Sequence, residues 1–401
     1  MMNTPTADTH LITQEEVLDR WLCSALEGGF QIAIWRAPKS NSVQLILDQT
    51  KEIKRVNLEL DILPQGFIAH PFADQEDQKA FFLEASDYFK FDIDTPMTEA
   101  EDELYKKAKR SPTEIKGQVN QLLRKAQPEK NSFQFSSTSK SSFIEFVEKG
   151  IKAIQDGKLS KVVPARIQKV HLKDNFDLTK TFLELCQRYP DAFVNFFHIP
   201  NVGTWLGATP EILIKTEGLY FHTMALAGTQ KAEGEDPVRN AAWKQKEIEE
   251  QAMVSRYIVN NFKKIRLREY EENGPKTVKA GNLLHLRSDF RVNMEATNFP
   301  QLGSVMLKLL HPTSAVCGTP REDSMKFILE HESFDRCFFA GFIGPVNIEN
   351  RTAIYVNLRT AQLINEDVLL YAGAGVTADS VPEKEWEETT LKCDIIGKFI
   401  Q

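Results

Sequence analysis

The feature that most constrains the fold is a run of strand-like segments with no helix between them. Four short segments, rich in β-branched, aromatic and small residues, follow one another: Phe193–His198, Thr204–Ala208, Ile212–Thr216 and Leu219–Ala225. Strands that come in runs joined by hairpins, with the helices in separate blocks, are typical of an α+β fold. The sequence therefore predicts α+β architecture with large antiparallel sheets.

The remaining elements fit the same interpretation. Further strands are predicted at Gln31–Trp35, Val43–Leu47, Phe67–Pro71, Lys161–Val170, near Leu283–Phe290, and at Cys337–Asn347, Ala353–Leu363 and Asp367–Ala372. Helices are predicted at Ser142–Asp156, Leu178–Arg188, Pro237–Lys264 and Pro320–His331. Pro164 interrupts its strand, which indicates a sheet edge or a bulge. The polar stretch Asp102–Gln127 is predicted to be an exposed helix or tether.

The bulk composition excludes several classes of protein. The chain has 401 residues, 42% of them hydrophobic and 26% charged, which is typical of globular proteins. A net charge of −7 without a basic stripe argues against nucleic-acid binding. Five scattered cysteines fit reduced thiols in the cytoplasm rather than a disulfide frame or zinc site. We find neither a signal peptide nor an apolar run long enough to span a membrane, so we expect a cytoplasmic protein.

Two pairs of glutamates have the spacing of metal ligands. Glu247 and Glu250 lie three apart in a helical stretch, and Glu385 and Glu388 repeat the spacing after the small residues of Tyr371–Gly375. Residues three apart share one face of a helix. Such carboxylates suit a hard cation such as Mg²⁺, although two solvated helix faces would have the same pattern. The small residues before the second pair would let a ligand approach the backbone.

Seven motifs, in order, resemble those of the chorismate-utilising enzymes, which include isochorismate, salicylate, anthranilate and aminodeoxychorismate synthases. They are Lys161-Val-Val-Pro-Ala-Arg166, Gly203-Thr-Trp-Leu-Gly-Ala-Thr-Pro-Glu211, Thr223-Met-Ala-Leu-Ala-Gly-Thr229, Lys246-Glu-Ile-Glu-Glu250, His311-Pro-Thr-Ser-Ala315, Phe334-Asp-Arg336 and the block from Tyr371 to Lys392. The resemblance covers roughly residues 142 to 400. It implies a single domain of two packed, mainly antiparallel β-sheets with helices outside.

The resemblance also divides the chain and assigns a metal. Residues 1–110 would be a variable N-terminal part of the same fold, 111–141 a polar helical connection, and 142–401 the chorismate-binding catalytic region. Mg²⁺ would bind a carboxylate of the substrate chorismate. Glu250 and Glu388 are then the expected metal ligands, with Glu247 and Glu385 completing or supporting the metal site.

Further positions are implied to contact the substrate. Arg359 would grip the other carboxylate, unless it is a strand arginine that reaches solvent, and Lys392 would lie near the metal. Backbone N–H groups of Gly228, Thr229 and the segment Gly373 to Gly375 would face substrate oxygens. His311 would line the site, although a core histidine that caps the turn at Pro312 is a close alternative. His285 matches a family position shared across activities, and Arg336 is expected to pair with a carboxylate beneath the sheet.

The catalytic groups implied are Lys161 and Glu211. A lysine acts as a base only when it is neutral, which requires burial or a nearby positive charge. Lys161 would activate water to attack ring carbon 2. Glu211 would protonate the hydroxyl that leaves carbon 4, which requires an apolar wall such as Trp205 or Ile212 to raise its pKa. The alternatives are that Lys161 is an exposed edge-strand lysine and that Glu211 is a turn residue after Pro210.

These positions favour isochorismate synthase among the relatives. Lys161 is typical of the water-using members, and Ala227 replaces the nucleophilic lysine of aminodeoxychorismate synthases. Phe339 stands where salicylate- and anthranilate-forming relatives tend to have Tyr, yet salicylate synthase, the anthranilate synthase large subunit and a non-catalytic chorismate-binding homologue stay open. We expect a monomer or weak homodimer without a glutaminase subunit, serving menaquinone or siderophore biosynthesis. Three positions depart from the family's pattern. Gln251 replaces the usual histidine, Pro164 an aliphatic residue, and Cys317 a glycine or another small residue.

Overall fold

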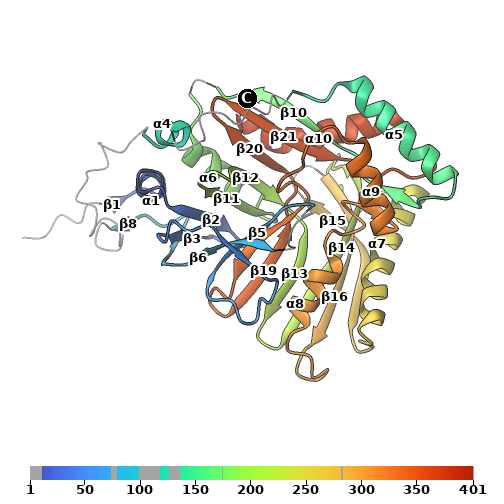
Figure 1. The fold of residues 1–401 in the computed structure, drawn as a ribbon, viewed down its shortest axis with the longest axis horizontal. Helices are drawn as coiled ribbons and strands as arrows, with labels where there is room; N and C mark the ends of the chain where they lie inside the picture. The colour runs from blue at the N-terminus through green and yellow to red at the C-terminus, as the bar shows by residue number, and fades with distance from the viewer. Residues whose placement is uncertain are drawn as a thin grey trace, which may run out of the picture.

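The computed structural model describes residues 11–73, 79–98, 118–125, 136–173, 175–280 and 283–400. Within these residues two large sheets dominate the molecule, and every pairing in them is antiparallel (Figure 1). The predicted α+β architecture with two packed antiparallel sheets is confirmed.

The eight-stranded sheet has the order β10-β21-β20-β12-β11-β2-β3-β7. Its strands are β10 (Ala165–His171), β21 (Asp367–Gly373), β20 (Thr360–Ile364), β12 (Gly203–Thr209), β11 (Phe193–Ile199), β2 (Gln31–Arg36), β3 (Ser42–Asp48) and β7 (Asp87–Asp92). The nine-stranded sheet has the order β15-β16-β14-β13-β19-β18-β5-β6-β4. Its strands are β15 (Glu271–Ala280), β16 (Leu283–Asn293), β14 (Tyr220–Lys231), β13 (Ile212–Glu217), β19 (Arg351–Val356), β18 (Phe342–Val346), β5 (Gly66–His70), β6 (Ala80–Glu84) and β4 (Lys54–Val56).

The two sheets pack face to face through aromatic side chains. Trp35 of β2 and Phe197 of β11, from one sheet, both contact Phe67 of β5 from the other, with ring centroids 5.7 and 5.9 Å from Phe67. Offset or tilted ring pairs of this kind add to the free energy gained by burying the rings. The residues before position 93 supply three strands to each sheet, so the same core joins the N-terminal and C-terminal parts of the chain.

Helices cover the outer faces of the sheets (Figure 1). A second core holds α1 (Gln14–Gly28), α4 (Gln118–Lys125), α6 (Leu178–Arg188) and α10 (Pro382–Ile400) against the eight-stranded sheet, while α7 (Gln245–Lys264) and α8 (Leu302–Leu310) pack on the nine-stranded sheet. The structure also contains α5 (Lys140–Gln155), α9 (Arg321–His331) and the short strand pairs β1 (Leu11–Ile12) with β8 (Met97–Thr98) and β9 (Lys161–Val162) with β17 (Gly318–Thr319). Local chemistry explains α6, which begins where the Asp177 side chain accepts a hydrogen bond from the Lys180 N–H at 2.9 Å.

Several predicted elements need correction. The helix predicted from Pro237 begins only at Gln245, and the strand predicted over Cys337–Asn347 is confined to β18, after two left-handed residues at Cys337 and Ala340. Most of Asp102–Gln127 lies outside the described residues. Its described part, α4, is no exposed tether, because Val119 and Leu123 are buried against α1.

The strand predicted over Ala353–Leu363 is in fact two strands of different sheets. β19 belongs to the nine-stranded sheet and β20 to the eight-stranded sheet, and the link between them contains Arg359 in the left-handed region, with φ 48°. A second link, Pro210-Glu211, joins β12 to β13 and also changes sheet. A third, Val163-Pro164, joins β9 to β10, which lies at a sheet edge, so the edge predicted at Pro164 is confirmed.

Two further observations concern the whole described chain. All five cysteines are free, and four of them are buried. None of the helices in the described residues combines the length and the apolar character that crossing a bilayer requires.

Candidate active site

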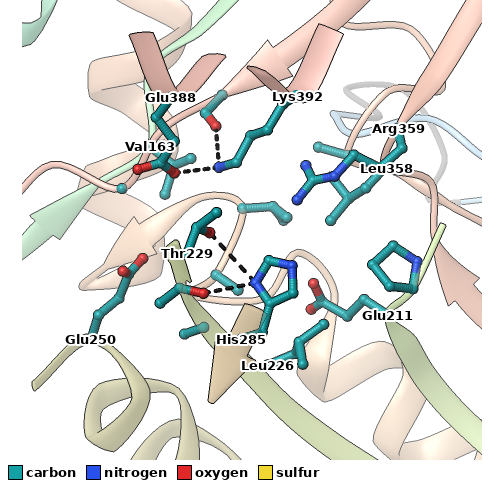
Figure 2. Close-up of a pocket in the computed structure, with 18 of the residues that line it drawn as sticks. Val163, Glu211, Leu226, Thr229, Glu250, His285, Leu358, Arg359, Glu388 and Lys392 are labelled. Atoms are coloured by element: carbon teal, nitrogen blue, oxygen red, sulfur yellow. Dashed lines mark hydrogen bonds and ion pairs between the residues drawn. The ribbon is translucent and has the colours of Figure 1, made fainter. Parts of the chain in front are cut away.

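A pocket lies where the chain changes sheets. Each of the three links contributes to its lining: Val163, then Pro210 and Glu211, then Leu358 and Arg359. The other lining residues are Leu226, Ala227, Gly228, Thr229, Glu250, His285, Ala315, Val316, Arg336, Phe339, Ala340, Gly373, Gly375, Glu388 and Lys392. Figure 2 shows Glu250 and Glu388 on one side of this pocket and Glu211 with Arg359 on the other.

Glu211 is a buried carboxyl in a largely apolar wall. The residue is 4% exposed, and its backbone is fixed because its carbonyl accepts a hydrogen bond from the Val356 N–H at 3.0 Å. Burial raises the pKa of Glu211 to about 7, although the positive charges of Arg359, Lys161 and Lys392 oppose the rise. A carboxyl with this pKa carries a proton during much of the time near neutral pH, so it can act as a general acid. Leu226, Leu358 and Phe339 line the same pocket, whereas Trp205 does not. Ile212, the other predicted wall residue, lines a second small cavity together with Glu211.

Arg359 is held beside Glu211 by an unusual backbone. Its left-handed φ of 48° is uncommon for a residue other than glycine, and its carbonyl accepts a hydrogen bond from the Ala208 N–H at 2.9 Å. The residue is 9% exposed, so it is not a strand arginine that reaches solvent. Within the described part of the chain no hydrogen-bond acceptor is recorded for its guanidinium, which faces the pocket (Figure 2). The side chain can therefore grip an anionic group bidentately.

A bulge in β14 shapes the floor of the pocket. The register between β14 and β16 shifts between Ala227 and Gln230, and Gly228 there has φ 70°. Because the Gly228 carbonyl lies 2.7 Å from His285 Nδ1, that nitrogen donates and carries the ring proton. Burial lowers the pKa of His285 to about 3, so the ring is neutral. Nε2 is then an acceptor, and it is buried without a partner among the described residues.

Lys161 and Glu250 form an ion pair over the backbone of Gly375. Lys161 Nζ lies 2.8 Å from Glu250 Oε1, and the lysine side chain is fully buried. A Cβ at Gly375 would lie only 2.4 Å from Glu250 Oε1 and 3.0 Å from Lys161 Cε. Burial opposes ionisation of Glu250, but the positive charges of Lys161, Lys392 and Lys246 together outweigh it, so the pKa of Glu250 falls below its usual value. Glycine is required at position 375 because the ion pair takes the space of a side chain.

Lys392 and Glu388, one turn apart on α10, form a second ion pair at the edge of the pocket. Lys392 Nζ lies 2.6 Å from Glu388 Oε1 and donates to the Gly373 carbonyl at 2.8 Å. The predicted N–H donors of Gly373 to Gly375 are only partly available, because the Ala374 N–H already donates to the Pro164 carbonyl at 3.1 Å.

The other two predicted metal ligands do not line the pocket. Glu247 caps the first turn of α7, where its side chain accepts from the Lys244 N–H at 3.0 Å. Glu385 is 1% exposed and pairs with Lys246. Burial and the nearby Glu388 raise the pKa of Glu385, and Lys246 opposes the rise.

The carboxylates fit a hard cation in kind and in position, since Glu250 and Glu388 lie on the same side of the pocket and Glu385 is close to Glu388. Among the described residues no three acidic, histidine or cysteine side chains are gathered closely enough to hold a metal as they stand. Glu250, Glu385 and Glu388 are each paired with a lysine instead.

Of the predicted substrate-binding residues, all of which lie in the described part of the chain, His311 is the one that does not line the pocket. Its ring packs edge-on against His70 and Phe342, with centroids 5.1 and 4.9 Å away, and it is not among the lining residues. Burial lowers the pKa of His311 to about 3. The structure therefore favours the alternative of a core histidine.

Sequence reasoning left three features out of the site. It noted His285 but gave it no role, and it missed the Lys246–Glu385 pair and the partner of Arg336, which is Glu332. The lysine at 246 is separated from Glu385 by 139 positions. No local sequence signal indicates such a pair, whereas the histidine could have been included from its place in the Leu283-to-Arg287 motif.

Several known proteins are similar to this chain. A family model described as chorismate binding enzyme matches residues 85–401. Isochorismate synthase DhbC of Bacillus subtilis is 31% identical over 259 residues, 61% of this chain and 64% of that protein, so the match spans slightly less than two thirds of the relative. Isochorismate synthase EntC of Escherichia coli K12 is 27% identical over 281 residues, 68% of each protein.

Two solved structures share the fold. The menaquinone-specific isochorismate synthase MenF of Escherichia coli has a TM-score of 0.72 at 21% identity, covering 96% of this chain and 91% of that chain. Anthranilate synthase component I of Streptococcus pneumoniae has a TM-score of 0.64 at 20% identity, covering 92% of this chain and 89% of that chain.

Proposed function

The chain belongs to the chorismate binding enzyme family, and we propose that within it this protein is an isochorismate synthase that converts chorismate to isochorismate. The observation that carries the proposal is the placement of two proton-transfer groups about one pocket. Glu211 lies on one side of the pocket and Glu250 on the other (Figure 2). Lys161 is fully buried behind the lining residues, and its Nζ lies 2.8 Å from Glu250 Oε1. Two groups with opposite roles on opposite sides of a ring are what an acid–base isomerisation needs.

The proposed reaction exchanges one hydroxyl position for another. Lys161 takes a proton from water as the water oxygen bonds to ring carbon 2. The ring double bond shifts, the bond from carbon 4 to its hydroxyl oxygen breaks, and Glu211 gives its proton to that oxygen, which leaves as water. One water is added and one is lost, so the product is an isomer. Lys161 can accept a proton only after its ion pair with Glu250 opens and the amine is neutral.

Two further groups would bind the substrate. Arg359 would hold a carboxylate, because its guanidinium faces the pocket without a recorded protein acceptor in the described structure. His285 would accept a hydrogen bond from a substrate hydroxyl through Nε2, because Nδ1 is committed to the Gly228 carbonyl. A buried acceptor without a protein partner costs free energy, which a bound hydroxyl would recover.

A divalent cation completes the proposal. Glu250 and Glu388, with Glu385 beside them, would hold Mg²⁺, whose charge would neutralise and orient a carboxylate of the substrate. The all-oxygen, all-anionic donor set supports a hard cation rather than zinc or iron. Glu247 caps the first turn of α7 and would support the metal site by fixing that turn.

Water rather than ammonia is the proposed nucleophile, with no glutaminase subunit and with a monomer or weak homodimer as the working form. Lys161 and Ala227 carry this part of the proposal by family resemblance, and the names of the relatives DhbC and EntC support it. The pathway served would be menaquinone or siderophore biosynthesis.

The test is product identification. Purified protein is incubated with chorismate and MgCl₂, with and without ammonium, and the products are separated by chromatography. We expect isochorismate alone, no product after EDTA treatment, and no change on adding ammonium. Salicylate with pyruvate, anthranilate, or unreacted chorismate would each overturn the assignment.

A further inference from the structure

Arg336 and Glu332 form a buried ion pair that the proposed chemistry does not use. Arg336 Nε lies 2.6 Å from Glu332 Oε1, and Arg336 Nη2 lies 2.7 Å from Glu332 Oε2, which makes the contact bidentate. The two side chains are 2% and 3% exposed. Arg336 lines the pocket on its Val316 side, so the pair is buried directly beneath the pocket wall.

The same pair holds both ends of the link between β9 and β10. Arg336 Nη2 donates to the Val163 carbonyl at 2.7 Å, and Glu332 Oε2 accepts from the Ala165 N–H at 3.1 Å. Arg336 Nη1 donates to the Val316 carbonyl at 3.0 Å. The arginine and the glutamate thus bind the residues on either side of Pro164.

This link needs side-chain partners because the strands around it belong to different sheets. β9 pairs with β17 and forms one isolated bridge, between Val162 and Val376, whereas β10 pairs with β21 in the eight-stranded sheet. Pro164 has no N–H of its own, and its carbonyl is taken by Ala374. The Val163 carbonyl and the Ala165 N–H would otherwise be buried without partners, which native proteins avoid.

Arg336 is not free to bind substrate. Each of its three guanidinium nitrogens donates to a protein acceptor, and the guanidinium carbon lies 4.3 Å from the centre of the Phe72 ring. Arg359, which lines the same pocket, has no such commitments among the described residues. The two arginines therefore have different tasks in one pocket.

We propose that the Glu332–Arg336 pair is a positioning pair that fixes the link after β9 and thereby directs the buried Lys161 toward Glu250, which lines the pocket. The proposal rests on the assigned isochorismate synthase reaction. Lys161 is the first residue of β9, two positions before Val163, and its own carbonyl is held by the Ser324 hydroxyl at 3.1 Å. A displacement of the link by about 1 Å would misplace a proton-transfer group, and errors of that size cost about 100-fold in rate.

The kinetic test compares two buried arginines. Arg336→Lys keeps the charge but cannot serve the two carbonyls and both carboxylate oxygens together. We expect its kcat to fall about 10- to 100-fold while KM for chorismate changes less than about threefold. Arg336→Met should lose more, and Glu332→Gln should fall between wild type and Arg336→Met.

Arg36→Lys is the matched control. Arg36 is also buried and donates to five carbonyls, those of Ala37, Cys186, Tyr189, Pro190 and Ala192, but it does not line the pocket. Its replacement should lower the melting temperature without changing kcat per folded molecule. If Arg336→Lys behaves in the same way, or if it raises KM and spares kcat, the positioning role is wrong.

A crystal structure of Arg336→Lys separates this inference from the proposed reaction. We expect residues 161–165 to shift and the Lys161–Glu250 contact to lengthen beyond hydrogen-bond distance. An unmoved link with the contact intact contradicts the inference whether or not the protein turns over chorismate. Wild-type protein that leaves chorismate unchanged would overturn the reaction alone.

Discussion

The two sides of the pocket differ in how their charges are satisfied. On one side, Glu250 and Glu388 are each paired with a lysine of the same chain. On the other side, neither the Arg359 guanidinium nor Nε2 of His285 has a hydrogen-bond partner among the described residues. Groups that the protein leaves unpaired in a pocket are suited to a ligand, whereas paired groups can exchange one partner for another.

The largest expected effects come from removing one group on each side. Glu211→Gln and Lys161→Ala should each lower kcat by about 10²–10⁴-fold, because each removes a proton-transfer group. Their stabilities should differ. Lys161→Ala leaves Glu250 without its buried counter-charge and should cost on the order of 3 kcal/mol, whereas Glu211→Gln removes no ion pair. Steady-state kinetics and urea unfolding of both variants measure the difference, and equal stabilities would remove the contrast between the two sides.

Gly375→Ala tests the paired side without removing a charge. Its new Cβ would lie 2.4 Å from Glu250 Oε1, so the ion pair with Lys161 must open or shift. We expect kcat to fall about 100-fold. Gly157→Ala is a control for backbone effects, since Gly157 has φ 74° and open space around its Cβ position. Unchanged turnover in Gly375→Ala would mean that the pair is not part of the chemistry.

Glu388→Ala tests the proposed cation. Removing one carboxylate should raise the half-saturating Mg²⁺ concentration by roughly 10- to 100-fold, while EDTA should abolish activity in wild type. Isothermal titration calorimetry with MgCl₂ provides a readout that does not depend on turnover. The exposed Glu387, on the same helix, gives the control variant Glu387→Ala. Indifference of both proteins to Mg²⁺ would contradict the metal assignment.

The smallest expected effect is a pH dependence of kcat and of stability, set by Glu211. Because Glu211 must donate a proton and its pKa is about 7, kcat should fall about tenfold per pH unit well above that value. The folded-state pKa is raised from 4.5, so the carboxyl's contribution to stability is full below pH 4.5 and is lost as pH rises through 7. Glu211→Gln should lack this decline in the free energy of unfolding. If the free energy of unfolding of Glu211→Gln falls with pH as it does in wild type, another group is responsible.

The sequence predicted most of the fold because its signals are local. Leu178–Arg188 is a helix over the predicted residues, and its Asp177 cap is visible in the sequence. The change of sheet at Asn357 to Arg359 could not be predicted. No glycine or proline marks the turn, and the left-handed Arg359 is stabilised by contacts with distant strands.

The site was predictable as a set of residues but not as a set of contacts. Glu211, Glu250, Arg359, Glu388 and Lys392 all reach the pocket, since family resemblance identifies residue types at given positions. The lysine partners of the glutamates were not foreseen, because Lys161 and Glu250 are 89 positions apart and meet only after the sheets have packed. His311 shows the opposite case, because its ring packs against His70 and Phe342 and the structure favours the core alternative.

The lysine–glutamate pairs also bear on how the chain is made. In zinc fingers the ion supplies the free energy of folding, and the apo polypeptide stays unfolded. Here Lys161, Lys246 and Lys392 balance three acidic side chains from within. A newly synthesised chain can therefore complete this part of its tertiary structure without an ion, and binding of the proposed cation would then be a late, reversible step.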